Sequence, residues 1–364
     1  MRLHHIKRIM ALALAACLLF LLSGCAPKTY EKHTTSFFGT FDTVITIQGF
    51  AASKEAFDRV AAKAQERFKE YHQLFDRYHP YEGINNLYTL NHTAAQGPVK
   101  VAKPLFDLLQ YSKQTQAATH GMVNIAFGTV LELWHDARDA AEASPADAYL
   151  PDMTKLKAAS LDTDINDLVL DQQALTVYYA DPALQIDLGA IAKGYAAELV
   201  AQEMLRSEVK SFYINAGGNV RLGHGPMDGR KNWGVAIQDP DGMVTADANT
   251  DILDVLFLHD SSIVTSGDYQ RFFLYEGKRY HHIVSPKTLM PTDYMRSVTI
   301  VTEDSGYADL LSTAVFLMPY EEGRAFVDSL QGVEALWVLN DRSIQMTDGL
   351  QKSARSMGAT NPAD

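Results

Sequence analysis

The spacing of apolar residues along the chain predicts both helices and strands. From Lys54 to Tyr78 apolar side chains recur at steps of three and four, which is typical of an amphipathic helix. Similar segments predict helices from Pro104 to Ala118 and from Asp304 to Met318. Short β-branched runs such as Phe41 to Ile47 predict strands. Helices and strands interleave, and several strands are joined by hairpins, so the expected fold class is α+β with mixed sheets and packed helices.

The second half of the chain contains most of the predicted strands. Arg271 to Val284 is expected to form a β-hairpin that turns at Glu276-Gly277-Lys278. The segment Ser211 to Arg221 is predicted as one strand that contains Gly217-Gly218. Residues 137–150, rich in Ala, Asp and Glu, are expected to form an exposed excursion.

The N-terminus has the pattern of an export signal. Three basic residues precede an uncharged apolar run from Ile9 to Leu22, and Ser23-Gly24-Cys25 follows. The run has fewer than the about 18 apolar residues expected of a membrane-spanning helix. Its ending resembles the lipobox of bacterial lipoproteins, which implies cleavage before Cys25 and lipidation of that thiol. The alternative is an ordinary leader with an incidental cysteine.

Composition narrows the classes of function. Cys17 and Cys25 are the two cysteines of the sequence. Cleavage before Cys25 would remove Cys17 and leave no thiol other than the lipidated one. The absence of a free thiol would exclude cysteine nucleophiles and Cys-ligated zinc. The formal charge of -12 argues against nucleic acid as a partner. The expected location is the cell membrane, lipid-anchored and facing the periplasm or the exterior. The predicted parts are a signal peptide (1–24), a lipid-anchored tether (25–36), a large domain (37–350) and a C-terminal tail (351–364).

Two glycine motifs are candidate ligand sites. Asp187 to Tyr195 places a carboxylate, two glycines and Lys193 at the start of a predicted helix, where backbone N–H groups favour phosphate. The alternative is a turn whose glycines allow tight packing. In Asn215 to Asn219 paired glycines interrupt a strand, which indicates either close approach of a ligand or a simple bulge.

Histidines and carboxylates supply candidate catalysts and metal ligands. His281 and His282 are adjacent in a strand and therefore point to opposite faces, so one of them can carry a proton at a site. Asp268 lies in a glycine-flanked turn. Asp309 and Thr313 lie four residues apart on an apolar predicted helix and share a face. A buried carboxylate there requires a partner, and Mg²⁺ is one candidate; capping of the helix is the alternative.

Taken in order, these segments resemble the ApbE family, the FAD:protein FMN transferases. The resemblance implies a T-fold-like domain over residues 37–350. It rests on eight segments that occur in the family's order: Phe38-Gly39-Thr40-Phe41, Leu74–Asn91, Gly121–Trp134, Asp187–Tyr195, Asn215–Arg221, Val264–Arg271, Arg279–Pro286 and Ser297–Met318.

The resemblance implies a reaction and its partners. With Mg²⁺, the FMN moiety of FAD would pass to a threonine hydroxyl of an acceptor flavoprotein subunit, with release of AMP. The implied acceptor motif is Asp-Gly-x-Thr-(Ser/Gly)-Ala-Thr. This chain has Asp348-Gly349-Leu350-Gln351, with Gln in place of the acceptor Thr, so it resembles the enzyme and not its substrate. The alternatives are a FAD pyrophosphatase that yields FMN and AMP, and a non-catalytic flavin-binding lipoprotein.

The resemblance also implies roles for single residues. From their own chemistry, and not from the resemblance, His282 is the candidate for the proton acceptor and Asp268 is its rival. Among metal ligands, Ser312 stands where some members have Asp. The implied metal ligands are the Ala190 carbonyl and the side chains of Asp309, Thr313 and Ser312. The implied flavin contacts are Phe38, Tyr78, Met122, Val123, Asn124, Asp187, Lys193 and Val284. The chain departs from the family's usual pattern at Phe38, Asn124, Ser285 and Leu289.

Overall fold

A central antiparallel sheet organises the chain. The computed structural model describes residues 29–242 and 251–363, so the predicted signal peptide and Cys25 lie outside the described residues. The sheet has eight strands in the order β1-β2-β6-β7-β10-β13-β14-β15, and each neighbouring pair is antiparallel. Smaller sheets are formed by β3-β5-β4, β8-β9 and β11-β12. Helices and antiparallel sheets together confirm the α+β class.

The helices and strands follow one another along the chain closely in the predicted order. The helices are α2 (Lys54–Phe75), α3 (Leu87–Thr93), α4 (Lys103–Thr115), α5 (Gly128–Ala143), α6 (Met153–Ala159), α7 (Ala192–Leu205), α8 (Ser305–Phe316), α9 (Tyr320–Asp328) and α10 (Asp348–Gln351). The strands are β1 (Glu31–Thr40), β2 (Thr43–Ala51), β3 (Val99–Lys100), β4 (Leu168–Asp171), β5 (Thr176–Tyr179), β6 (Phe212–Ala216), β7 (Asn219–Leu222), β8 (Trp233–Gln238), β9 (Ile252–Leu258), β10 (Ser262–Gly267), β11 (Phe272–Tyr275), β12 (Lys278–His281), β13 (Met295–Thr302), β14 (Glu334–Leu339) and β15 (Ile344–Met346).

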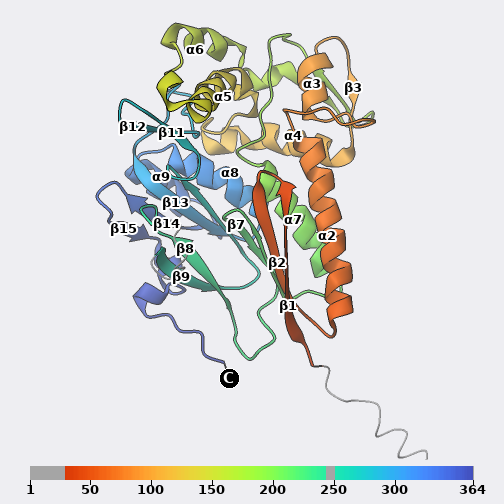
Figure 1. Cartoon of the computed structure of the whole chain (residues 1–364), viewed down its shortest axis with the longest axis vertical. Helices are drawn as coiled ribbons and strands as arrows, with labels where there is room; N and C mark the ends of the chain where they lie inside the picture. The colour runs from red at the N-terminus through yellow and green to blue at the C-terminus, as the bar shows by residue number, and fades with distance from the viewer. Residues whose placement is uncertain (1–28, 243–250, 364) are drawn as a thin grey trace, which may run out of the picture.

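The two faces of the sheet are covered by different elements. Helices α2, α7 and α8 pack on one face, and the β8–β9 hairpin packs on the other (Figure 1). Because side chains alternate along a strand, β14 sends Trp337 to the helical side and Leu336 to the hairpin side. Both side chains are fully buried. The sheet is therefore a middle layer, and its strand ends are open to loops that build a site.

A third apolar cluster joins α5 to the β11–β12 hairpin. Trp134 of α5 stacks near Tyr280 of β12, and its indole N–H donates to the Leu289 carbonyl at 3.1 Å. Figure 1 shows α5 and α6 at the far end of the molecule from the β8–β9 hairpin. This packing fixes the position of the hairpin that carries His281 and leads into His282.

The structure corrects three predictions from the sequence. Residues 31–36, assigned to the tether, belong to strand β1, which pairs with β2 throughout this segment. Residues 137–143 are not an exposed excursion, because they complete α5 and bury Ala137 and Ala141. Gly217-Gly218 is not a bulge inside one strand. It is the two-residue turn between β6 and β7, with φ of +60° and +86°, values that glycine adopts without strain.

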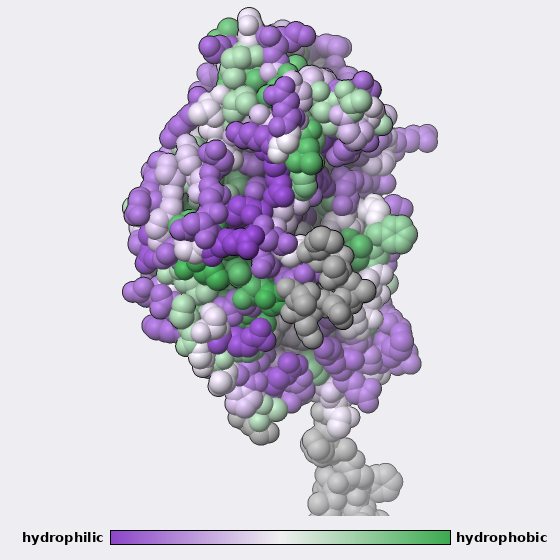
Figure 2. Space-filling model, turned by 60° about the vertical axis from the view of Figure 1, so that its left-hand side comes forward, coloured by the Kyte–Doolittle hydropathy of each residue, from purple (hydrophilic) through white to green (hydrophobic). Residues whose placement is uncertain are grey.

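The C-terminal segment packs on the domain. Residues after α10 form a short 3₁₀ turn at Arg355–Met357, Ala354 is fully buried, and Ala363 bridges to Arg230. In the part of the chain that the structure describes, no helix is both long and apolar enough to cross a membrane. Figure 2 shows a face on which hydrophilic residues predominate and hydrophobic ones gather in small patches.

Candidate active site

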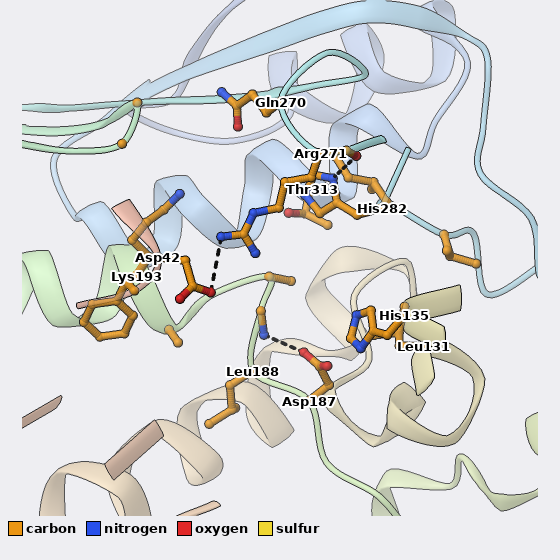
Figure 3. A pocket seen from close by; sticks show the side chains of 18 of the residues that line it. Asp42, Leu131, His135, Asp187, Leu188, Lys193, Gln270, Arg271, His282 and Thr313 are labelled. Atoms are coloured by element: carbon orange, nitrogen blue, oxygen red, sulfur yellow. Dashed lines mark hydrogen bonds and ion pairs between the residues drawn. The ribbon is translucent and has the colours of Figure 1, made fainter. Parts of the chain in front are cut away.

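A large pocket opens where one end of the sheet meets α5 and the hairpin β11–β12. Its volume is about 1130 Å³, at the upper end of the range of about 300–1,000 Å³ usual for small-molecule sites. The walls come from loops far apart in the sequence (Figure 3). The lining segments are the β1–β2 turn, the end of α2 and the residues after it, residues 122–127, part of α5, the turn before α7, the β6–β7 turn, residues 238–242, the segment before β11, the residues after β12 and one face of α8.

The turn before α7 is held by a buried ion pair. Asp187 accepts a hydrogen bond from the Gly189 N–H at 2.7 Å and one from Arg77 at 2.6 Å. Arg77, two residues after the end of α2, also pairs with Glu132 of α5. Burial opposes ionisation of Asp187, but the Arg77 guanidinium outweighs it and holds the pKa of this carboxyl below its ordinary value. The Asp187–Arg77 ion pair therefore anchors the turn, and Ala190 and Lys193 of this turn line the pocket.

Helix α8 places a second carboxylate against the start of α7. Asp309 is buried and accepts a hydrogen bond from the Gly194 N–H at 2.7 Å. A Cβ on Gly194 would lie 2.5 Å from the Asp309 Cβ, so glycine is required for this close approach. Burial raises the pKa of Asp309, and the Lys193 charge opposes that rise. One turn further along α8, Thr313 lines the pocket, and Figure 3 shows it facing the same space as Lys193.

The residues around Asp309 offer oxygen donors of the kind that suit Mg²⁺. Among the described residues, no group of three or more His, Cys, Asp and Glu side chains is placed to hold a metal ion. The candidate metal ligands are instead the Asp309 carboxylate, the Thr313 hydroxyl and the Ala190 carbonyl. These are hard oxygen donors of the kind that Mg²⁺ prefers. Mg²⁺ usually takes few protein ligands and completes its shell with water and substrate phosphates. The Ser312 hydroxyl is engaged with Ser266 at 2.9 Å and with the Asp309 carbonyl at 2.9 Å.

The two adjacent histidines lie on opposite faces, as their positions in the sequence predict. His281 is buried, and its Nε2 contacts the Thr292 carbonyl at 2.6 Å. His282 lines the pocket, and its Nδ1 lies 3.2 Å from the Arg271 carbonyl (Figure 3). A carbonyl only accepts hydrogen bonds, so Nδ1 carries the hydrogen and Nε2 of the neutral ring is left as a proton acceptor. Burial, with a further contribution from Arg271, lowers the pKa of His282 to about 3.

Asp268, the rival catalyst, is already occupied. One of its oxygens accepts from Arg296 at 2.8 Å and the other from Arg279 at 3.2 Å. It does not lie among the residues that line the pocket. Of the two candidates, His282 is therefore the one that lines the pocket.

The predicted flavin contacts divide into two groups. Phe38 stands apart, because it lies on β1, is 84% exposed and does not line the pocket. Asn124 caps the following 3₁₀ turn by accepting from the Ala126 N–H at 3.0 Å. Those that line the pocket are Tyr78, Met122, Val123, Asn124, Asp187, Lys193 and Val284.

Several pocket residues were not singled out from the sequence. Arg77 directly precedes Tyr78, and Arg271 ends one of the matching segments, but a single arginine gives no signal of where its side chain points. His135 of α5 lies 3.2 Å from the Tyr78 hydroxyl. Asp42, in the β1–β2 turn, forms an ion pair with Arg271. Each of these contacts joins segments that are distant in the sequence.

Comparison with known proteins identifies the family. The sequence pattern of the ApbE family matches residues 41–337, most of the chain. The chain belongs to the ApbE family. As a member of this family, the protein is an enzyme that transfers FMN from FAD to an acceptor protein.

Curated relatives of the ApbE family share this activity by name. A FAD:protein FMN transferase of Treponema pallidum is 33% identical over 287 residues, which cover 75% of this chain and 76% of that protein. A FAD:protein FMN transferase of Klebsiella pneumoniae is 31% identical over 278 residues, which cover 75% of this chain and 82% of that protein.

Solved ApbE structures share the fold. The ApbE protein of Thermotoga maritima matches with a TM-score of 0.75 and 26% identity, over 89% of this chain and 99% of that one. The flavin transferase ApbE of Vibrio cholerae matches with a TM-score of 0.72 over 89% of this chain and 100% of that one. At 22% identity, the second likeness shows the fold alone. For an ApbE enzyme, the large pocket is the expected place for a dinucleotide substrate.

Proposed function

We propose that this enzyme is a Mg²⁺-dependent transferase that moves the FMN moiety of FAD to a threonine hydroxyl. The acceptor is a flavoprotein subunit with the motif Asp-Gly-x-Thr-(Ser/Gly)-Ala-Thr. The observation that carries the proposal is the meeting of three features in one pocket. They are Thr313 of α8 with Ala190 of the glycine turn as oxygen donors, the Lys193 cation, and the neutral His282 with Nε2 free to accept a proton.

The proposed step is an in-line displacement at phosphorus. The threonine oxygen bonds to the phosphorus on the FMN side, the P–O bond to the AMP phosphate breaks, and AMP leaves. His282 takes the hydroxyl proton at Nε2, and Lys193 holds negative charge of the pyrophosphate. Catalysis of this kind is mostly positioning and electrostatic stabilisation.

The metal would be held by the Ala190 carbonyl, the Asp309 carboxylate and the Thr313 hydroxyl. When bound, Mg²⁺ neutralises pyrophosphate charge and polarises the phosphoryl group. The protein's own contribution is to bury Asp309 at a place where Gly194 and Lys193 compensate its charge only partly.

Mass spectrometry of an acceptor protein tests the reaction. After incubation with the enzyme, FAD and Mg²⁺, the acceptor is expected to gain the mass of one FMN at the threonine of its motif. An acceptor with Thr→Val at that position should gain nothing, and equal labelling of this variant would overturn the threonine assignment. A parallel reaction without acceptor measures AMP release, which reports FAD pyrophosphatase activity at the same site.

A His282→Gln variant tests the base. General base catalysis contributes about 10²–10⁴-fold, so transfer should fall within that range while FAD binding is kept. Because the pKa of His282 is about 3, the ring is already neutral near pH 7. Wild-type transfer should therefore show no titration of His282 between about pH 6 and 8. Undiminished transfer by His282→Gln contradicts the assignment.

We further propose that the enzyme is anchored to the cell membrane by lipid on Cys25, facing the periplasm or the exterior. The support is the lipobox-like ending of the signal sequence. Metabolic labelling with a palmitate analogue should mark the wild-type protein and not Cys25→Ser. The variant should also leave the membrane fraction, and its retention there without label would contradict the anchor.

A further inference from the structure

The cations that face the pocket differ in how firmly they are held. Arg77 is buried against Asp187, and Arg279 donates to Asp268 while lying over the Phe272 ring. Arg271 is different, because it is exposed and its guanidinium lies 3.6 Å from the Asp42 carboxylate. Figure 3 shows the Arg271 side chain reaching across the pocket to Asp42. Arg271 is thus the less firmly bound of these three guanidinium groups.

Asp42 is held at the pocket edge by its turn. Phe41 and Asp42 join β1 to β2 with φ of +53° and +50°, a left-handed conformation that aspartate tolerates and phenylalanine adopts only when other contacts enforce it. Those contacts are visible, because the Phe41 N–H donates to His72 at 3.3 Å and the Phe41 ring packs on the His72 ring. The backbone of this turn therefore places the Asp42 carboxylate within reach of Arg271.

The Asp42–Arg271 pair is weak and easily replaced. The side chains are 77% and 49% exposed. Exposed ion pairs contribute about 0–1 kcal/mol, because water screens the charges. A guanidinium binds phosphate through two parallel charged hydrogen bonds, which are about twice as strong as neutral ones. A phosphate that enters the pocket is thus a better partner for Arg271 than Asp42 is.

The backbone of Arg271 is tied to the proposed base. Its carbonyl accepts from the His282 N–H at 3.1 Å and contacts His282 Nδ1 at 3.2 Å. The guanidinium and the imidazole are therefore anchored at one point of the pocket wall. A phosphate bound by Arg271 would lie near the ring that accepts the proton.

We propose that Asp42 and Arg271 form a latch across the pocket that opens when FAD binds. The Arg271 guanidinium exchanges the Asp42 carboxylate for the FAD pyrophosphate and becomes a specificity-determining contact for it. In the free protein, Asp42 competes with FAD for the guanidinium. This inference rests on the proposed function, since it takes the FAD pyrophosphate to occupy this pocket.

A double-mutant cycle on FAD affinity tests the latch. Binding is measured by quenching of flavin fluorescence, with EDTA present and no acceptor, so that no turnover occurs. Loss of the arginine–phosphate contact in Arg271→Gln should weaken FAD binding about tenfold. Asparagine, like aspartate, tolerates the left-handed turn. With Arg271 present, Asp42→Asn should tighten FAD binding about threefold relative to the wild type. In the Arg271→Gln background, Asp42→Asn should change FAD affinity by less than about 1.5-fold, because no guanidinium remains to be released.

Asp58→Asn is the matched control for net charge. Asp58 forms an exposed ion pair with Lys54 on α2, away from the pocket, and its substitution also removes one negative charge. FAD affinity should not change in this variant. Thermal unfolding of all variants confirms that they remain folded, as expected for an exposed pair.

Two results would overturn the latch. One is equal tightening by Asp42→Asn with and without Arg271, which would show that Asp42 acts only by repelling FAD. The other is wild-type affinity in Arg271→Gln. The proposed function is tested separately by transfer from FAD to the acceptor threonine in the wild type with Mg²⁺. A failure there leaves the binding cycle interpretable, and a failure of the cycle leaves the transfer reaction standing.

Discussion

Two buried carboxylates border the start of α7, and their surroundings give them opposite properties. Asp187 on the glycine turn is paired with the Arg77 guanidinium, which overcomes burial and lowers its pKa. Asp309 on α8 has the Gly194 N–H as a hydrogen-bond donor and a more distant Lys193 charge, so burial prevails and its pKa is raised.

The difference separates a carboxylate whose charge the chain compensates from one whose charge it compensates only in part. A buried charge requires a partner, and Arg77 already supplies it for Asp187. The negative charge of Asp309 is only partly compensated by the chain. The protein has already removed this carboxylate from water, so a cation bound there would interact with it more strongly. Four predictions test this contrast, from the largest expected effect to the smallest.

Asp309→Ala is expected to remove transfer almost completely. A metal supplies several kcal/mol of transition-state stabilisation, and about 1.4 kcal/mol is tenfold in rate, so the loss should be roughly 10³-fold or more. The measurement is FMN transfer to the acceptor protein at saturating FAD. Asp58→Asn serves as the control that keeps activity. Full transfer by Asp309→Ala would end the metal assignment.

Arg77→Met is expected to destabilise the fold. Removing one partner of a buried ion pair costs about 3–5 kcal/mol, because Asp187 is left buried without compensation. Urea denaturation measures this free energy of unfolding. The double variant Arg77→Met/Asp187→Asn should recover much of the loss, since no buried charge remains. Equal destabilisation of the single and double variants would mean that the Arg77 side chain matters for its packing alone.

Mg²⁺ is expected to stabilise the wild type and not Asp309→Asn. A ligand at one hundred times its Kd stabilises a folded protein by about 2.7 kcal/mol. Urea denaturation with MgCl₂ and with EDTA gives the difference for each protein. Asp187→Asn should still respond to Mg²⁺, because its carboxylate is already paired with Arg77. A response of Asp309→Asn equal to that of the wild type would place the metal elsewhere.

The two carboxylates should also have opposite effects on the pH dependence of stability. The folded pKa of Asp187 is lowered, so its contribution to stability is present above its unfolded pKa of about 3.9 and is lost as pH falls through the folded pKa. The folded pKa of Asp309 is raised, so its contribution is present below about 3.9 and is lost as pH rises through the folded pKa.

Denaturation in EDTA at a series of pH values compares each Asp→Asn variant with the wild type. As pH rises from about 3 to 6, the stability of the wild type relative to Asp187→Asn should increase, and relative to Asp309→Asn it should decrease. Changes of the same sign in both comparisons would contradict the contrast.

The sequence predicted the elements better than their boundaries. The apolar spacing of α2 and α8 identified both helices, because each buries a wide face against the sheet. Strand β1 was missed because its outward residues are polar and its partner β2 lies on one side only. The helix over residues 128–143 was missed in part because its exposed Ala, Asp and Glu residues resemble a loop in composition.

The site was predicted in its parts and not in its connections. Asp309 and Thr313 were placed on one helix face by their spacing of four, and His281 and His282 on opposite faces by adjacency in a strand. Packing decides which of the two histidines faces the pocket. His281 is buried and contacts the Thr292 carbonyl, and this leaves His282 to face the pocket. Arg77 and Arg271 gave no signal, since both act on segments distant in the sequence.

By itself the sequence determined the fold class, the family resemblance and the set of chemical groups available. These follow from local periodicity and from motifs, which need no knowledge of distant contacts. Only the tertiary structure decided which carboxylate the chain compensates fully and which it compensates only in part. Ionisation of a buried group depends on charges within a few ångströms, and for Asp187 that charge comes from Arg77, 110 positions away in the chain.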